Sequence, residues 1–200
     1  MNILSIESSF DVCGASLILG GKHIDTVETR VPRMHSKFLA VYVEEVLRKN
    51  KATIEGIDCI AVSVGPGSYT GLRIGVSLAK GLALPFSKPI HPVDSFDIAR
   101  SQINEKSNFS IAFHSHRNFV YHCYVDKKGS MSVPEICSID KVVAKKIYGY
   151  NLKIISESLN YIEIMPSAKV LAEYALANSN IELPAVNNIS PIYLSISNED

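Results

Sequence analysis

The fold is decided by one stretch, residues 61–75, which reads AVSVGPGSYTGLRIG. The apolar run from Cys59 to Val64 predicts a buried strand, and the glycines and proline after it predict a tight turn. A helix is then expected from about Thr70 to Leu84, ending before Pro85. Because a buried strand passes through a tight turn straight into a helix, the stretch is typical of an α/β protein.

The turn between this strand and this helix has two interpretations. Backbone amides at a helix start can hold an anion, which makes Gly65, Gly67, Ser68 and Thr70 candidate nucleotide- or anion-binding residues. Alternatively, the turn is structural, with Ser68 or Thr70 as the helix N-cap. A Walker P-loop is excluded because no Gly-Lys-Ser or Gly-Lys-Thr follows, and the GxSxG spacing of a serine hydrolase is lacking.

Two helices carry more apolar surface than one sheet needs. The helix expected over Lys37–Lys49, with Ser36 as its N-cap, is apolar over roughly 240° of its helical wheel. A stripe of about 100° is enough to cover a sheet. The helix at 70–84 is apolar almost all round, and one ridge of it has a small residue at every fourth position: Gly71, Gly75, Ala79 and Ala83. The excess predicts a second surface, either the other helix or a partner protein.

The remaining elements predict a two-lobed α/β chain, with a lobe at 1–103 and a smaller one at 104–200. In the first lobe we expect strands at 2–8, 13–19, 23–30 and 89–93, a hairpin turn at Gly20-Gly21 and a helix at 95–103. In the second we expect strands at 110–113, 119–125, 131–136 and 153–156, a helix at 167–178 and a final loop from 187.

Composition excludes several classes of protein. The 200 residues contain 20 lysines and arginines and 20 aspartates and glutamates, so the chain lacks the basic surplus of an autonomous nucleic-acid binder. The sequence has neither a secretory signal nor a run of about 18 apolar residues, which predicts a cytoplasmic protein that does not cross a membrane. The four cysteines form no CxxC pair and are expected to be reduced: Cys13, Cys59, Cys123 and Cys137.

The segment Gly65–Gly75 resembles the signature of the TsaB (YeaZ) family. The resemblance extends to Ile3–Leu17, to His35-Ser36 and to Pro191–Leu194. It implies an actin-like and hexokinase-like ATPase (ASKHA) fold, with two lobes of related topology and a reduced second lobe. It also implies a non-catalytic role in making N6-threonylcarbamoyladenosine at position 37 of tRNA. The family's older label as a peptidase finds no chemical support in these residues.

The resemblance also implies partners. We expect the chain to bind and activate the larger transferase subunit, TsaD, with the ATPase subunit TsaE completing the complex; a homodimer is possible when the chain is alone. No cofactor or metal of its own is expected, since ATP or adenylate and the metal belong to the partner, and tRNA is contacted only through the complex. In the family the first two helices form the interface, which here nominates His35, Phe38, Leu39, Tyr42, Val43, Val46, Gly71, Leu72, Gly75, Leu78, Ala79 and Leu82.

A second hypothesis is a small stand-alone nucleotide-binding enzyme of the sugar-kinase and acetate-kinase superfamily. Glu7, Ser8 and Ser9 lie where the fold family places its first phosphate turn, so they are candidate nucleotide-binding residues. An enzyme of this type needs a second phosphate turn in the other lobe, and the sequence offers no convincing one. A metal site is not expected: His114 and His116 could share one side of a strand, but no third ligand is evident although His122 and Cys123 are near.

Overall fold

The computed structural model describes residues 1–30 and 32–195, which form two compact units. The first unit combines Met1–Ile98 with Pro166–Ile192, and the second contains Ala99–Met165 and the described residues that follow Ile192. This division differs from the expected halves at 1–103 and 104–200. The difference arises because the helix near residue 170 returns to cover the first sheet instead of staying with the second.

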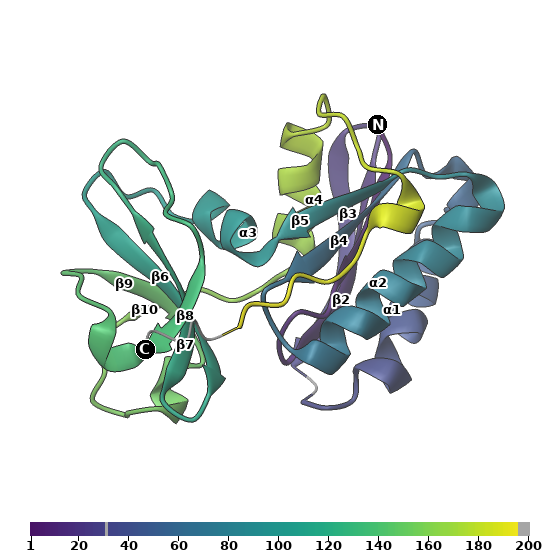
Figure 1. The fold of residues 1–200 in the computed structure, drawn as a ribbon. Helices are drawn as coiled ribbons and strands as arrows, with labels where there is room; N and C mark the ends of the chain where they lie inside the picture. The colour runs from purple at the N-terminus through teal and green to yellow at the C-terminus, as the bar shows by residue number, and fades with distance from the viewer. Residues whose placement is uncertain (31, 196–200) are drawn as a thin grey trace. The chain divides into compact units, whose positions relative to one another are not determined.

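The first unit is built on a five-stranded mixed sheet with the order β3-β2-β1-β4-β5 (Figure 1). The chain opens with the predicted antiparallel meander, and the next two strands add in parallel to β1. The bounds are β1 Ile3–Glu7, β2 Val12–Leu19, β3 Lys22–Arg30, β4 Cys59–Gly65 and β5 Ile90–Asp94. The strand–turn–helix segment therefore lies beside β1, in the middle of the sheet.

Helices cover both faces of this sheet. Helices α1 (His35–Lys49) and α2 (Tyr69–Ala83) lie side by side on one face, and α4 (Ala168–Ala177) lies on the other (Figure 1). Alternate side chains of each strand serve the two faces: Leu4 of β1 packs with α1 and α2, whereas Ile3 packs with α4. Burial on both faces explains why β1 and β4 read as continuous apolar runs. The short helix α3 (Ser95–Ser101) follows β5.

The two helix caps turn out differently from each other. Ser68 is the N-cap of α2, and its side chain accepts a hydrogen bond from the Gly71 N–H, as one prediction had it. The prediction that Ser36 caps the first helix is wrong, because α1 begins at His35 with Met34 at the N-cap position. Ser36 therefore lies within the first turn of α1.

The second unit repeats the strand order of the first on a smaller scale. Its sheet has the order β10-β9-β6-β7-β8, so the strands follow one another in space as in the first sheet (Figure 1). The crossovers before and after β9 carry short 3-10 turns, Ile139–Lys141 and Leu152–Ile154, where the first unit has α1 and α2. The unit is thus a reduced copy. Its strands are β6 Phe109–His116, β7 Phe119–Val125, β8 Glu135–Ser138, β9 Ile147–Tyr150 and β10 Ile162–Glu163.

Sequence patterns were least reliable in this second unit. The strand predicted at 153–156 is wrong: that apolar run is a 3-10 turn entered through Asn151, which has a left-handed backbone. The strand β9 was missed because its Ile-Tyr-Gly-Tyr sequence has no clear alternation, and parallel pairing with β6 holds it in place. The strand predicted at 131–136 is displaced toward the C-terminus, and Met131 forms an isolated bridge with Val125.

The cysteine and membrane predictions can also be compared with the structure. All four cysteines lie within the described residues, and all are free and buried, as predicted. In the described part of the chain, no helix is long and apolar enough to cross a membrane. The final loop predicted from 187 begins with a 3-10 turn at Val186–Asn188, and its residues 196–200 lie outside the described part.

Candidate functional site

The turn between β1 and β2 is organised around the carboxyl group of Glu7. Its Oε1 accepts three hydrogen bonds: from the Ser9 N–H at 2.7 Å, from the Ser9 hydroxyl at 2.5 Å and from the Ser63 hydroxyl at 3.0 Å. The Ser8 hydroxyl points elsewhere and donates to the carbonyl of Gly71 at 2.9 Å. Glu7, Ser8 and Ser9 are all buried. The structure therefore brings together the first set of nucleotide-site candidates, but their polar groups already bond to each other, to Ser63 or to Gly71.

The same turn packs directly on the N-terminal part of α2. A Cβ added to Gly71 would lie 2.2 Å from the Ser8 carbonyl oxygen, and one added to Gly67 would lie 2.1 Å from the Ser9 carbonyl oxygen. Gly65 has a φ of 109°, a backbone conformation that residues other than glycine rarely adopt. The glycines of the signature are thus required by a close approach within the chain.

This packing uses the groups that an anion would need. The Ser68 N–H donates to the Ser9 carbonyl at 2.5 Å, and the Gly71 N–H donates to the Ser68 hydroxyl at 3.2 Å. The hydroxyl and N–H of Ser9 are already directed at Glu7. Between the two interpretations of the turn, this arrangement favours the structural one. Gly65, Gly67 and Ser68 lie together at the turn, and Thr70 lies exposed in the first turn of α2.

Burial changes the acid–base behaviour of Glu7. Removal from water raises the pKa of this carboxyl group above its usual 4.5, and the hydrogen bonds from Ser9 and Ser63 only partly oppose the shift. Within the described residues, Oε2 has no hydrogen-bond partner. Both observations favour the neutral, protonated form. Glu7 thus acts as a buried hydrogen-bond acceptor that holds the turn.

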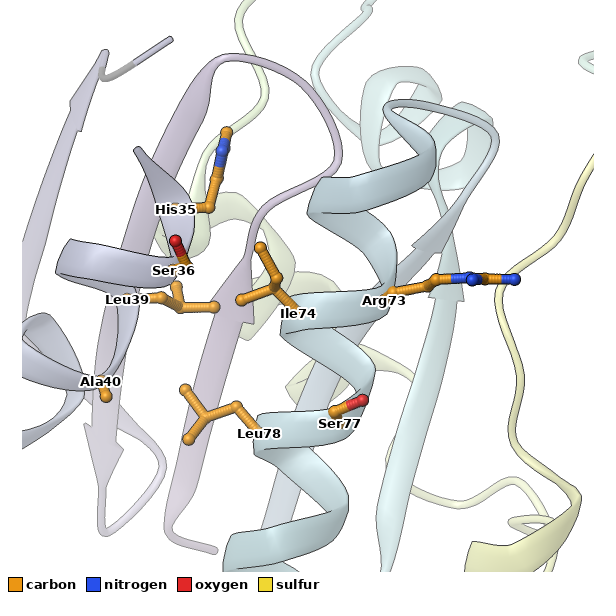
Figure 2. A pocket seen from close by; sticks show the side chains of 8 residues that line it. All are labelled: His35, Ser36, Leu39, Ala40, Arg73, Ile74, Ser77 and Leu78. Atoms are coloured by element: carbon orange, nitrogen blue, oxygen red, sulfur yellow. The ribbon is translucent and has the colours of Figure 1, made fainter. Parts of the chain in front are cut away.

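A groove runs between α1 and α2 on the outer side of the first unit (Figure 2). Its volume is about 420 Å³. Leu39, Ile74 and Leu78 point toward one another and form its apolar floor (Figure 2). Small side chains line its edges: Ser36 and Ala40 on α1, and Ser77 on α2. An apolar floor between small side chains lets a helix from another protein approach closely.

The structure places the predicted interface residues at different depths. Eight are buried by the chain itself: His35, Leu39, Val43, Val46, Gly71, Leu72, Gly75 and Ala79. Four are half-buried: Phe38, Tyr42, Leu78 and Leu82. The small-residue ridge of α2 faces the chain's own Ser8 turn, because added Cβ atoms at Gly71 and Gly75 would both meet Ser8. Part of the excess apolar surface is therefore satisfied inside the first unit.

The exposed residues of these helices were missed as candidates. Val41 is 50% exposed on α1, and Tyr69 is 55% exposed at the start of α2. The Arg73 guanidinium lies 4.0 Å from the centre of the Tyr69 ring. His35 is tied down instead, since its Nε2 lies 3.1 Å from the Val12 carbonyl oxygen. Helical periodicity alone gives no signal that separates the exposed residues from the buried ones on such apolar helices.

His114 and His116 each make contacts of their own near the end of β6. The register of β6 shifts between them, so they do not follow the simple alternation of a strand. His114 Nε2 lies 3.2 Å from the Arg117 carbonyl oxygen, and the His116 ring stacks on Phe119. Each histidine is thus engaged locally.

Comparison with known proteins relates this architecture to one pathway. The family described as "tRNA N6-adenosine threonylcarbamoyltransferase" (TsaD) matches residues 27–131, which is just over half of the chain. A curated relative from Buchnera aphidicola, named tRNA threonylcarbamoyladenosine biosynthesis protein TsaB, is 26% identical over 217 aligned positions. That alignment covers 96% of this chain and 97% of the relative. The likeness therefore extends through the second unit, where sequence motifs were weak.

Solved structures agree on the fold. YeaZ from Pseudomonas aeruginosa superposes with a TM-score of 0.79 at 20% identity, covering 96% of this chain and 99% of YeaZ. A more distant match, with a TM-score of 0.50 and 9% identity, covers 92% of this chain and all of the activator of 2-hydroxyisocaproyl-CoA dehydratase from Clostridium difficile. The shared strand order of the two sheets is that of the actin-like ATPase fold. The family match shows that the chain belongs to the tRNA N6-adenosine threonylcarbamoyltransferase (TsaD) family, and over its full length it is similar to the TsaB (YeaZ) proteins of tRNA threonylcarbamoyladenosine biosynthesis.

Proposed function

We propose that this chain is a non-catalytic subunit that binds and activates the larger transferase, TsaD, through α1 and α2. The observation that carries the proposal is the groove between these helices, with its floor of Leu39, Ile74 and Leu78. An apolar groove of this shape fits a helix from a partner. We also propose that TsaE completes the complex, that the free chain can form a homodimer and that tRNA is contacted only through the complex. The proposed location is the cytoplasm.

The hydrogen bonds that Ser8 and Ser9 already make within the chain support the non-catalytic part of the proposal. In a nucleotide-binding relative this turn would offer its N–H and hydroxyl groups to phosphates. Here the N–H and hydroxyl of Ser9 already donate to Glu7, and the hydroxyl of Ser8 already donates to Gly71. A phosphate at this turn would have to break these bonds. We therefore expect ATP, adenylate and the metal to be bound by the transferase, and we expect no ATP hydrolysis by this chain alone.

The proposal is tested by size-exclusion chromatography with light scattering on the chain, alone and mixed with the transferase subunit. Ala40 lies exposed at the edge of the groove, so Ala40→Arg places a long charged side chain there without entering the core. Ala177 is also an exposed helical alanine of the first unit, at the end of α4, which makes Ala177→Arg the matched control. Circular dichroism verifies that both variants are folded.

We expect the native chain and Ala177→Arg to form the same complex with the transferase, and Ala40→Arg to bind at least about tenfold more weakly, a loss of about 1.4 kcal/mol. Charge buried against an apolar floor is the physical reason. Unchanged binding by Ala40→Arg would place the interface elsewhere. Failure of the native chain to associate, with tRNA and ATP present, would refute the proposal.

A further inference from the structure

Three ligand-type side chains meet on one face of the second sheet. Among the described residues, His122, Glu135 and Cys137 place an imidazole nitrogen, a carboxylate oxygen and a sulfur within 4.8 Å of one another. His122 lies on β7 directly opposite Glu135 on β8, and Cys137 is two residues further along β8. Residues two apart on a strand share a face, so the backbone itself sets this grouping. From this grouping we infer a zinc site with His122, Glu135 and Cys137 as its ligands.

The spacing of the three atoms suits one ion. Ligands of a tetrahedral zinc lie 2.0–2.3 Å from the metal, which puts them about 3.3 to 3.8 Å from one another. Here His122 Nδ1 lies 3.0 Å from Glu135 Oε1, and the Cys137 sulfur lies within 4.8 Å of the ligand atoms of both residues. The Glu135 side chain is 57% exposed and can adjust its rotamer. Small rotations therefore suffice to place the three atoms around an ion.

A fourth residue prepares the histidine. His122 Nε2 lies 2.9 Å from the hydroxyl of Ser110 on β6, and that hydroxyl is buried. When Nε2–H donates to Ser110, the lone pair of Nδ1 faces Glu135 and Cys137. Zinc-bound histidines typically have their second nitrogen held in this way. Ser110 is thus a positioning residue for the site.

The charges also match. A thiolate and a carboxylate together neutralise a divalent ion, so the bound site carries no net charge beside the apolar cluster that includes Val120 and Cys137. Binding transfers the Cys137 thiol proton to solvent as the sulfur–metal bond forms. Mixed nitrogen, sulfur and oxygen ligands favour zinc over magnesium or calcium, which prefer oxygen alone. One coordination position stays open to water.

The site would fasten the edge of the smaller sheet. β8 is a terminal strand of the order β10-β9-β6-β7-β8, and the metal would join it to β7 next to the reduced crossovers. This proposal departs from the expectation of no metal site. Sequence spacing could not reveal it because Cys137 is fifteen positions from His122, and the neighbouring Cys123 points to the opposite face of β7.

The test is titration of the demetallated full chain with Co²⁺, followed by displacement with Zn²⁺. Thiolate-to-cobalt charge-transfer absorption reports a sulfur ligand directly. The variants are Cys137→Ser, Glu135→Gln and Ser110→Ala, with Cys123→Ser as the matched control for a buried cysteine. Glu135→Gln changes an exposed side chain, so it tests the site even where Cys137→Ser fails to fold.

We expect one equivalent of Co²⁺ to give the thiolate band in the native chain and in Cys123→Ser, and Zn²⁺ to abolish the band in both. Cys137→Ser should lose the band. Glu135→Gln and Ser110→Ala should weaken binding about 10- to 100-fold. Absence of a thiolate band in the native chain at millimolar Co²⁺ would overturn the inference. Retention of the band by Cys137→Ser, or native affinity in Glu135→Gln, would overturn it as well.

Discussion

Replacement of Gly71 by alanine should destabilise the chain, although alanine is the better helix former. The added Cβ would lie 2.2 Å from the Ser8 carbonyl oxygen, whereas real Cβ atoms essentially never come closer than 3.0 Å to a heavy atom beyond their own and adjacent residues. The turn or the helix must therefore move by about 0.8 Å. The turn resists this movement because Ser8 bonds to the Gly71 carbonyl and Ser9 bonds to Glu7.

The size of the loss follows from three contributions. Overpacking of a buried contact costs about 1 to 3 kcal/mol, and loss of the Ser8 hydrogen bond costs about 1 kcal/mol more. The gain in helix propensity returns at most about 1 kcal/mol. The free energy of unfolding should therefore fall by about 2 kcal/mol, a decrease in Tm of about 4 to 8 °C for a chain of this length.

Gly81 provides the matched control on the same helix. It is exposed, and among the described residues nothing lies within 4 Å of an added Cβ. Gly81→Ala should therefore raise stability by up to about 1 kcal/mol. Urea denaturation followed by circular dichroism measures both variants. If Gly71→Ala proves as stable as Gly81→Ala, the close approach of α2 to the Ser8 turn is refuted.

Two buried carboxyl groups predict how stability depends on pH. Burial raises the pKa of Glu7 above 4.5, so this carboxyl group ionises at lower pH in the unfolded chain than in the folded one, and the free energy of unfolding falls as pH rises past 4.5. Glu7→Gln cannot ionise at this position, so its free energy of unfolding, measured by urea denaturation, should fall less steeply between pH 4.5 and 7.5. An unchanged slope would contradict a protonated Glu7. Burial likewise raises the pKa of Asp94 to about 6 from 3.8. The contribution of this carboxyl group to stability is therefore fully present below pH 3.8 and is lost as pH rises through 6, which lowers the free energy of unfolding by about 3 kcal/mol at most. Asp94→Asn keeps an acceptor for the Phe96 N–H and should recover up to that amount at pH 7, measured as a rise in Tm at pH 7 and none at pH 3.5.

The first unit could be predicted from sequence because its signals are local. The Gly20-Gly21 turn joins two strands, and the glycine-rich break after β4 joins a buried strand to a helix. Each signal lies within a few residues of the element that it specifies. The return of α4 to the first sheet could not be predicted in this way, since it depends on which of two sheets offers an uncovered apolar face.

The candidate site shows the same limit. Helical periodicity identified the apolar surface of α1 and α2, but it could not separate the part buried inside from the part exposed. The glycine ridge illustrates the reason: small side chains predict a close backbone approach, and they do not identify the approaching chain. In the structure, the segment that approaches this ridge is the chain's own Ser8 turn.

The signature motif and the proposed interface are therefore coupled through one helix. Gly71 sets how close α2 comes to the Ser8 turn, and Ile74 and Leu78, one and two turns further along α2, form part of the groove floor. A change that pushes the start of α2 outward also displaces the surface offered to a partner. In the proposed interface, the signature residues would matter for binding without touching the partner, because they fix the position of α2, which carries the proposed contact. A phosphate-binding turn would require the opposite arrangement, with its amides and hydroxyls left free.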